Sequence, residues 1–261
     1  MRVTILASGS GGNALLVESS GARVLVDAGI PAPTIAKRMA ASGHRAGPQA
    51  VLVTHAHGDH HRYAVDAALR FRAPVWVSDA TRPMLSLQGA PSVRVFGTRE
   101  PFRVGDLVIK PLPVPHDAAQ VALRFEDDEG HSVALATDLG EVTDGLVNHL
   151  RGAEVVLLES NHDVDMLWKG PYSNSLKRRI ASPRGHLSNE ATASALARLD
   201  ARTRTVCLMH LSETNNTPAI ALDRAAEALA ELPSKLLAAS QDVPLVIDLA
   251  PPRQLALFRG A

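Results

Sequence analysis

The feature that most constrains this chain is a histidine-rich segment directly after a short apolar run. The run Val51-Leu52-Val53 leads into Thr54-His55-Ala56-His57-Gly58-Asp59-His60-His61. Neutral imidazole and carboxylate are side chains that bind zinc and similar divalent ions. His55 and His57 stand two apart, so an extended backbone points both the same way. Asp59 and His60 are adjacent at a predicted helix start and point elsewhere. The spacing favours two neighbouring metal ions, with a polar loop or one adventitious ion as the alternatives.

The composition is that of a globular protein without a strong charge. The chain has 261 residues, of which 46% are hydrophobic, enough for one large domain or two small ones. Its formal net charge is zero and its aromatic content is 3%. These values exclude a global basic field and argue against an extended base-stacking platform. Any contact with nucleic acid must therefore come from a local patch.

The cysteine content and the N-terminal pattern bear on the compartment. The single cysteine, Cys207, excludes an intramolecular disulfide and fits a reducing compartment. It lies in an apolar run, so we interpret it as a small buried residue. No signal-peptide pattern precedes the first strand-like residues, and no apolar run approaches about 18 residues. We therefore expect a soluble, cytoplasmic protein with no membrane contact and no obligate protein partner.

Strand-like and helix-like patterns alternate along the chain. Predicted strands or strand hairpins cover residues 3–6, 14–18, 22–26, 50–53, 74–77, 93–96, 102–109, 121–125, 132–136, 154–158, 205–209 and 245–249. Predicted helices cover residues 31–42, 59–71, 79–87, 189–199 and 218–232, and the chain closes with a proline-rich end. Because no repeat or linker interrupts this alternation, it predicts one domain over residues 1–261, built of sandwiched sheets with outer helices.

Polar side chains recur where predicted strands end. His116 follows a strand that contains prolines. The histidine-rich segment 54–61, called the metal loop below, is predicted to hold two ions, and His116 is the expected third ligand of the first ion. Asp138 follows strand 132–136, where a carboxylate can bridge two cations. Asp27 closes strand 22–26, and an acid at the end of an apolar run usually has a polar partner. We expect Asp27 to support the metal loop without binding a metal itself.

The pattern His55-x-His57-x-Asp59-His60, followed by His116, Asp138 and His210 at strand ends, resembles the metallo-β-lactamase superfamily. The resemblance implies an α/β fold, a four-layer αβ/βα sandwich with a two-metal site between the sheets. It implies that His55, His57 and His116 hold one ion. Asp59, His60 and His210 would hold the other, with Asp138 as the bridging ligand. Histidine and carboxylate sets of this kind accept zinc or manganese.

Other segments resemble the YycJ/WalJ branch of that superfamily. They are 8–13, 137–140, 159–162, 185–189 and 210–216. This resemblance implies 5′-to-3′ exonuclease activity on DNA. Gly185-His186 before a capped helix is also similar to the transfer-RNA 3′-processing endonucleases, which implies that His186 assists the leaving group. The chain lacks the inserted arm of those endonucleases. The interval from Asp138 to His210 is also too short for the extra domain of the β-CASP nucleases.

The sequence therefore predicts a phosphodiesterase that depends on two divalent ions, with Asp59, Asp138 and His186 as catalytic residues. We expect His186 to protonate the departing alkoxide or to stabilise charge on the phosphate, unless it is a structural histidine near a helix start. The favoured activity is a 5′-to-3′ exonuclease on single-stranded DNA or related nucleic acid. The alternatives are a hydrolase of thioesters, lactones or small phosphodiesters on the same metal site, and a non-catalytic nucleic-acid-binding protein.

Phosphate contacts are expected from hydroxyl and amide side chains near the predicted site, together with one helix N-terminus. These residues are Ser188, Asn189, Asn161, Asn215 and Asn216. Asparagine pairs are also common in plain turns, so the pair at 215–216 has two explanations. The basic run from Lys177 to Arg184 either binds the backbone of a single strand or forms a solvated helix face. The glycine-rich loop 7–13 either approaches an anion or forms a tight hairpin.

Overall fold

Within the described part of the chain, the strands form two sheets of seven strands each. A computed structural model describes residues 1–249 of the chain. The strands of the first sheet, in spatial order, are β14 (Leu245–Asp248), β1 (Arg2–Ala7), β2 (Ala14–Glu18), β3 (Arg23–Val26), β4 (Ala50–Val53), β5 (Val75–Ser78) and β6 (Val93–Phe96). Those of the second are β13 (Lys235–Ala238), β12 (Thr205–Met209), β11 (Val155–Glu159), β10 (Ser132–Ala136), β9 (Gln120–Glu126), β8 (Leu107–Val114) and β7 (Phe102–Val104).

Each sheet has an antiparallel part and a parallel part. Strands β3 to β6 run parallel in the first sheet, and β10 to β13 run parallel in the second. Parallel strands need crossover connections, which cover the outer faces of both sheets with helices. The helices of residues 1–249 are α1 (Ala32–Ala41), α2 (Gly58–His61), α3 (Ala64–Phe71), α4 (Asp144–Leu150), α5 (Val164–Lys169), α6 (Asn174–Ile180), α7 (Asn189–Leu196) and α8 (Pro218–Ala228). Of these, α1, α3, α4, α7 and α8 pack on the outer faces of the sheets.

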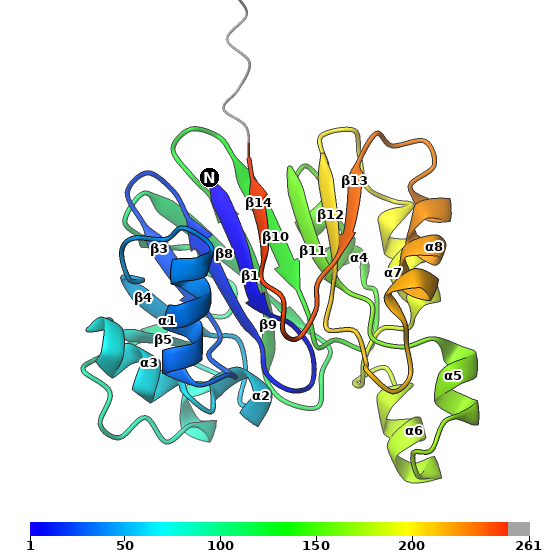
Figure 1. The fold of residues 1–261 in the computed structure, drawn as a ribbon, viewed down its shortest axis with the longest axis horizontal. Coiled ribbons are helices and arrows are strands. Elements are labelled where there is room, and N and C mark those ends of the chain that lie inside the picture. The colour runs from blue at the N-terminus through cyan, green and yellow to red at the C-terminus, as the bar shows by residue number, and fades with distance from the viewer. Residues whose placement is uncertain (250–261) are drawn as a thin grey trace, which may run out of the picture.

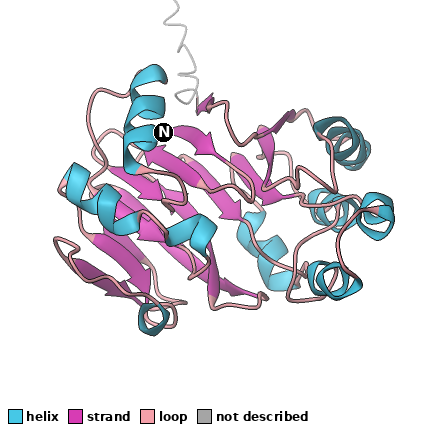
Figure 2. Ribbon diagram, turned by 60° about the horizontal axis from the view of Figure 1, so that its bottom comes forward, coloured by secondary structure: helices cyan, strands magenta, loops and turns pink. Residues whose placement is uncertain are grey.

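Three apolar clusters hold the layers together. The central cluster joins the facing sides of the two sheets, with residues such as Ile5 on β1 and Phe125 on β9. A second cluster packs the outer face of the first sheet against α1 and α3, and a third packs the second sheet against α4, α7 and α8. Figure 1 and Figure 2 show the helices outside the paired sheets. This is the four-layer αβ/βα arrangement that the sequence predicts.

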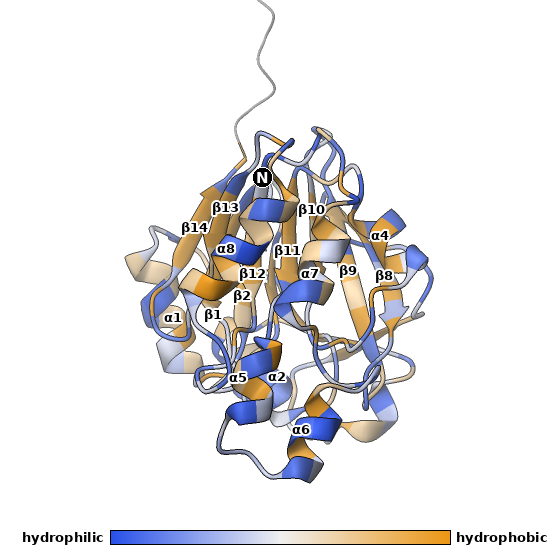
Figure 3. Ribbon diagram, turned by 90° about the vertical axis from the view of Figure 1, so that its right-hand side faces the viewer, coloured by the Kyte–Doolittle hydropathy of each residue, from blue (hydrophilic) through white to orange (hydrophobic). Residues whose placement is uncertain are grey.

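The hydropathy of the strands follows from this layering. Every residue of β4 and β11 is buried, since each strand has a sheet neighbour on both sides and apolar layers on both faces. Figure 3 shows the apolar strands behind α7 and α8, whose outer faces are more polar. Cys207 on β12 is among the buried residues, and burial raises the pKa of its thiol to about 12. This agrees with its interpretation as a packing residue.

Several predicted element bounds are wrong. The helix predicted over 59–71 is two helices, because the backbone N–H of Tyr63 donates to Ala28 O and leaves the helical ladder. The helix predicted over 79–87 is only a 3₁₀ turn, η1 (Arg82–Met84). The helix predicted over 218–232 ends at Ala228 and is followed by β13, which the sequence does not predict.

The helices α4, α5 and α6 are also missed, since six or seven residues are too few to display a helical period. In the views of Figure 1 and Figure 3, α5 and α6 lie at the same end of the molecule as α2. None of the helices in residues 1–249 is long and apolar enough to cross a membrane. The predicted proline-rich end lies outside the described residues.

Candidate metal centre

Residues from both sheets meet beyond the carboxyl ends of their strands. Asp27 follows β3, His55 lies just after β4, Asp138 lies just after β10, and His210 follows β12. Three of these residues adopt left-handed backbone conformations, with φ of 60° at Asp27, 57° at Asp138 and 53° at His210. Such conformations cost non-glycine residues of order 1–3 kcal/mol and are concentrated at functional sites. The chain therefore turns sharply where it places these side chains.

The first ligand set comprises His55, His57 and His116. One ligand atom from each lies within 4.8 Å of the others. His116 Nε2 faces His57 Nδ1 at 3.2 Å. His55 Nε2 is buried and makes no hydrogen bond among the described residues. Three imidazole nitrogens that converge on one point fit a cation better than they fit one another.

The second set comprises Asp59, His60, Asp138 and His210, again with ligand atoms within 4.8 Å of one another. His60 Nε2 lies 3.1 Å from Asp138 Oδ2, and His210 Nε2 lies 3.5 Å from Asp59 Oδ2. His210 Nε2 and Asp138 Oδ2 make no hydrogen bond within residues 1–249, although both are buried. The structure thus places Asp138 with the second set.

The outer ring nitrogens of these histidines show which tautomer each adopts. His60 Nδ1 lies 2.7 Å from an oxygen of Asp27, and His116 Nδ1 lies 3.1 Å from Gly185 O. His57 Nε2 lies 3.0 Å from Asp117 Oδ1. Carboxylate and carbonyl oxygens only accept, so in the neutral rings these nitrogens carry the protons. The opposite nitrogen of each ring then presents a lone pair to the centre, as metal-binding histidines do.

Asp27 is hydrogen-bonded to the metal loop. Its carboxylate accepts from the backbone N–H and the hydroxyl of Thr54 at 2.9 Å to 3.1 Å, in addition to its contact with His60. The Thr54 hydroxyl in turn lies 3.1 Å from His55 Nδ1. One buried acid therefore orients one histidine of each ligand set.

Glu159, the last residue of β11, is a site residue that the sequence analysis did not single out. It is fully buried, and its Oε1 lies 2.8 Å from His186 Nδ1 and 3.1 Å from His210 Nδ1. Its Oε2 accepts from the backbone N–H groups of Leu139 and Leu187. The missed signal was an acid ending an apolar strand, the same pattern that identified Asp27.

The charges of this cluster balance one another. Burial opposes ionisation of Asp138, but His210 and His60 hold its pKa well below the ordinary range. Burial likewise opposes charge on His210, but Asp138, with hydrogen bonds to Asp59 and Glu159, raises its pKa to about 10. The buried carboxylates and rings thus favour opposite charges on one another. Divalent cations would replace the protons of the rings on binding.

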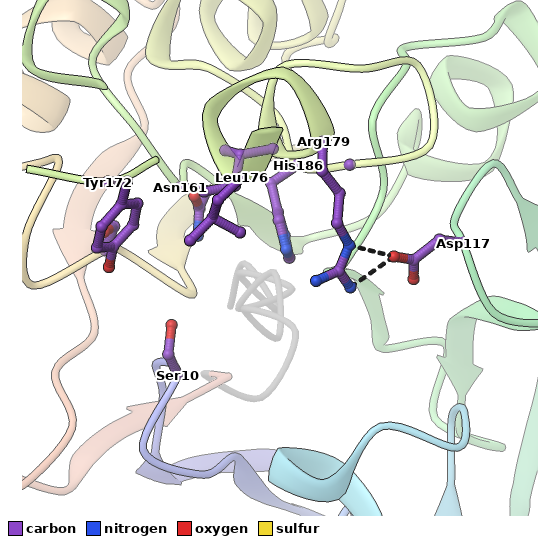
Figure 4. Close-up of a pocket in the computed structure, with 10 residues that line it drawn as sticks. Ser10, Asp117, Asn161, Tyr172, Leu176, Arg179 and His186 are labelled. Carbon is purple, nitrogen blue, oxygen red and sulfur yellow. Dashed lines mark hydrogen bonds and ion pairs between the residues drawn. The ribbon is translucent and has the colours of Figure 1, made fainter. Parts of the chain in front are cut away.

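His186 stands beside the ligand sets and belongs to neither of them. Burial disfavours its charged form, but the carboxylate of Glu159 and its hydrogen bond raise the pKa of the ring. With Nδ1 held by Glu159, Nε2 is directed toward a cavity, as Figure 4 shows. A third cluster of Asp138, Glu159, His186 and His210 also has its ligand atoms within 4.8 Å.

The structure places most of the expected phosphate-binding residues away from the cavity beside His186. Asn189 and Asn216 are buried and bind each other through their amides at 2.9 Å and 3.0 Å. Asn215 is buried, with an exposed fraction of 1%, and Ser188 caps α7. None of these four lines the cavity beside His186. Only Asn161 of the expected group lines it.

The basic run also divides into different environments. Lys177 is buried and donates its ammonium to Trp168 O at 2.8 Å, which excludes it from a solvated or strand-binding face. Arg179 donates to Asp117 at 2.7 Å, and Arg178 is exposed. Arg184 is exposed and lines a second cavity of about 510 Å³ that also contacts His116. The run is therefore not a single phosphate-binding surface.

The metal loop packs against Gly29 so closely that no side chain fits there. A Cβ atom at Gly29 would lie 1.7 Å from Asp59 O and 2.6 Å from Asn13 N. We expect Gly29→Ala to displace the loop, lower the free energy of unfolding by about 1–3 kcal/mol and reduce metal binding. Gly145→Ala is the matched control, since its nearest neighbour is 3.7 Å away and its helical position favours alanine. Equal metal content in both variants, measured by elemental analysis, would contradict the packing argument.

Comparison with known proteins agrees with this geometry. Residues 22–211 match the model of the beta-lactamase superfamily domain. The chain belongs to this superfamily. It is 36% identical over 231 residues to the exodeoxyribonuclease WalJ of Streptococcus pneumoniae, covering 84% of this chain and 85% of that protein. It is 35% identical over 237 residues to the exodeoxyribonuclease YycJ of Bacillus anthracis, covering 88% and 90% respectively.

Solved structures support the same fold. The metallo-beta-lactamase fold protein YhfI from Bacillus subtilis superposes with a TM-score of 0.71, at 18% identity, over 95% of this chain and 99% of that one. At this identity the similarity shows the fold alone. The predicted resemblance to a YycJ-like member of the metallo-β-lactamase superfamily is confirmed, as is the sandwich fold.

Proposed function

We propose that this protein is a metal-dependent nuclease that degrades single-stranded DNA or a related nucleic acid from its 5′ end. The observation that carries the proposal is the pairing of two converging ligand sets with His186, which lies next to a cavity and whose Nδ1 is held by Glu159. The similarity of this protein to two exodeoxyribonucleases over most of the chain supports the same activity. We also propose that it acts in the cytoplasm as one domain without a protein partner, in keeping with its single cysteine.

The residues present fit two divalent ions, either zinc or manganese. We assign His55, His57 and His116 to one ion and Asp59, His60 and His210 to the other, with Asp138 as their shared ligand. Bound there, the two ions would lower the pKa of a water molecule and neutralise phosphoryl oxygens.

The side chains around the centre have separate roles in this proposal. Asp59 and Asp138 place negative charge at the centre, which keeps the ligand sets close together. Glu159 orients His186 and, through its second oxygen, fixes the backbone of Leu139 next to Asp138. His186 Nε2 is then free to give a proton to the departing oxygen, a step that a phosphodiester needs because an alkoxide is a poor leaving group.

The rival function is hydrolysis of a thioester, lactone or small phosphodiester on the same metal site. Ligand geometry does not separate these substrates, since acyl and phosphoryl transfer both use paired cations. The His186–Glu159 pair favours the phosphodiester, because a thiolate leaves readily without a proton donor. The exposed Arg178 and Arg184 at the site end of the molecule favour a polyanion over a small acyl substrate.

We expect the purified protein to carry about two metal ions per chain and to lose hydrolysis when a chelator removes them. Re-addition of zinc or manganese should restore degradation of end-labelled single-stranded DNA. Elemental analysis measures the metal content of the protein. The same preparation is then assayed on DNA and RNA, by the size of the products, and on a thioester. Chelator-treated protein without added metal is the control. Thioester hydrolysis without nucleic-acid cleavage would replace this proposal with its rival.

A further inference from the structure

The cavity beside His186 has features that metal binding does not explain. It has a volume of about 180 Å³ and is lined by Ser10, Asp117, Asn161, Tyr172, Leu176, Arg179, Ile180, Gly185, His186 and Ser212. Most of these residues come from the segment carrying α6, with Ser10 opposite on the β1–β2 loop, as Figure 4 shows. None of the lining residues belongs to either ligand set assigned above. The cavity is therefore adjacent to the metal centre and separate from it.

The walls of the cavity differ in polarity. Tyr172, Leu176 and Ile180 form an apolar and aromatic side, while Ser10, Asn161 and Ser212 supply polar atoms. Within residues 1–249 the hydroxyls of Ser10 and Tyr172 make no hydrogen bond, and the Asn161 amide nitrogen donates to His210 O at 2.9 Å. A nucleoside has apolar ring faces and polar edges, and aromatic side chains stack on such faces without regard to sequence.

The charged wall of the cavity is already neutralised. Arg179 reaches across the opening to Asp117, whose other oxygen contacts His57, as the dashed lines in Figure 4 show for the first pair. The guanidinium remains partly exposed, with 58% of its side chain accessible. Apart from His186, the other lining side chains carry no charge, which suits a sugar and base better than a phosphate.

For a cut at the P–O3′ bond, which leaves a 5′-phosphate on the remaining strand, the position of His186 determines which part of the strand would enter this cavity. Hydroxide forms a new bond to phosphorus, the P–O3′ bond breaks, and its electron pair stays on O3′, which takes the proton from His186 Nε2. O3′ belongs to the nucleotide on the 5′ side of the broken bond. That nucleotide must therefore lie on the His186 side, which is the side of the cavity.

We propose that this cavity binds the 5′-terminal nucleoside of the strand, with Tyr172 stacked on its base. This rests on the proposed nuclease function and deepens it. The volume of about 180 Å³ is below the roughly 300–1,000 Å³ typical of drug-sized ligands, so the cavity takes one nucleoside and no more. The strand on the 3′ side continues past His116 and Arg184 through the larger cavity of about 510 Å³. The α5–α6 segment thus acts as a stop that limits each cut to one nucleotide.

The test removes the tyrosine ring with Tyr172→Ala and the 5′-terminal base from the substrate, first separately and then together. The substrate is a 3′-labelled single strand, with or without an abasic 5′-terminal residue, and kcat/KM is measured for release of that residue. We expect either change alone to lower kcat/KM by roughly 5- to 150-fold, the range of a base–aromatic stack, mostly through KM. On the abasic strand, Tyr172→Ala should have the same kcat/KM as the unmodified protein. The tyrosine ring and the terminal base act on each other, so removing the second of them costs nothing more.

Control variants separate stacking from general damage. Tyr172→Phe keeps the ring and should retain activity on both strands. Trp168→Ala removes an aromatic side chain that is 47% exposed on α5 but does not line the cavity, and it should leave both rates unchanged. Metal content, measured by elemental analysis, should be the same in Tyr172→Ala as in the unmodified protein, because none of the assigned ligands lines the cavity.

The outcomes distinguish failure of this inference from failure of the proposed function. Additive losses from the two changes would overturn the cavity assignment, as would greater sensitivity to an abasic residue at the 3′ end. Loss of metal from Tyr172→Ala would also overturn it, since Tyr172 would then be structural. No cleavage of DNA by the unmodified, metal-loaded protein would overturn the proposed function itself and this inference with it.

Discussion

Asp138→Asn should abolish hydrolysis and remove at least one metal ion while leaving the fold intact. The carboxylate is 1% exposed and lies 3.1 Å from His60 Nε2 and 3.5 Å from His210 Nδ1. Loss of its charge should weaken metal binding by more than the 10- to 100-fold typical of changes outside the ligand shell. Metal content, activity and circular dichroism on the same preparation make the measurement.

Asparagine is the appropriate replacement because of the backbone at this position. Asp138 has φ of 57°, and asparagine tolerates the left-handed region whereas alanine does not. Asp138→Ala would add backbone strain of order 1–3 kcal/mol to the loss of charge, so its effect would have two causes. Asp144→Asn, an exposed acid at the start of α4, is the matched control. An Asp138→Asn protein that keeps two metal ions and full activity would contradict the assigned site.

The strand-end positions of the ligands were predictable from the apolar runs that precede them, whereas their assignment to two ions came from the family resemblance. His55 follows β4 of the first sheet, and Asp138 and His210 follow β10 and β12 of the second, so they come together where the carboxyl ends of strands from the two facing sheets meet. Each of these residues directly follows an apolar run, or lies within two residues of one, that the period of a strand identifies. The structure brings all seven predicted ligands into two adjacent sets.

The remaining site residues depend on tertiary contacts that no local pattern reveals. Asn189 and Asn216 are polar residues of the kind that contact phosphate, yet they lie 27 positions apart and bind each other in the interior. Lys177 reads as a surface cation, but the short α6 turns its ammonium onto a carbonyl of α5. Glu159 was predictable in principle, since it repeats the strand-end pattern of Asp27.

The α5–α6 segment shows the limit most clearly. Its two helices have six and seven residues, too short for periodicity to detect, and each begins at a side-chain cap, Asp163 or Ser173. The sequence displays only its basic charge. Its role in forming a cavity beside His186 depends on how it folds back over the strand ends.

His186→Ala should slow cleavage of single-stranded DNA by about 10²–10⁴-fold, the usual contribution of a positioned proton donor. The same variant should lose much less on bis-p-nitrophenyl phosphate, whose leaving group departs without a proton. Metal content should stay unchanged, because His186 belongs to neither assigned ligand set. Rates on both substrates and elemental analysis make the measurement.

Glu159→Gln tests the orientation of the same ring. Glutamine keeps the size of the side chain but loses the charge that raises the pKa of His186, and its NH2 group cannot accept from the backbone N–H groups of Leu139 and Leu187 as Oε2 of Glu159 does. Like His186→Ala, it should slow cleavage of DNA much more than hydrolysis of bis-p-nitrophenyl phosphate. It should also lose some metal, because Glu159 orients the metal ligand His210. If His186→Ala lost activity equally on both substrates with its metal retained, the histidine would stabilise charge on the phosphate. Proton transfer to O3′ would then have to come from solvent.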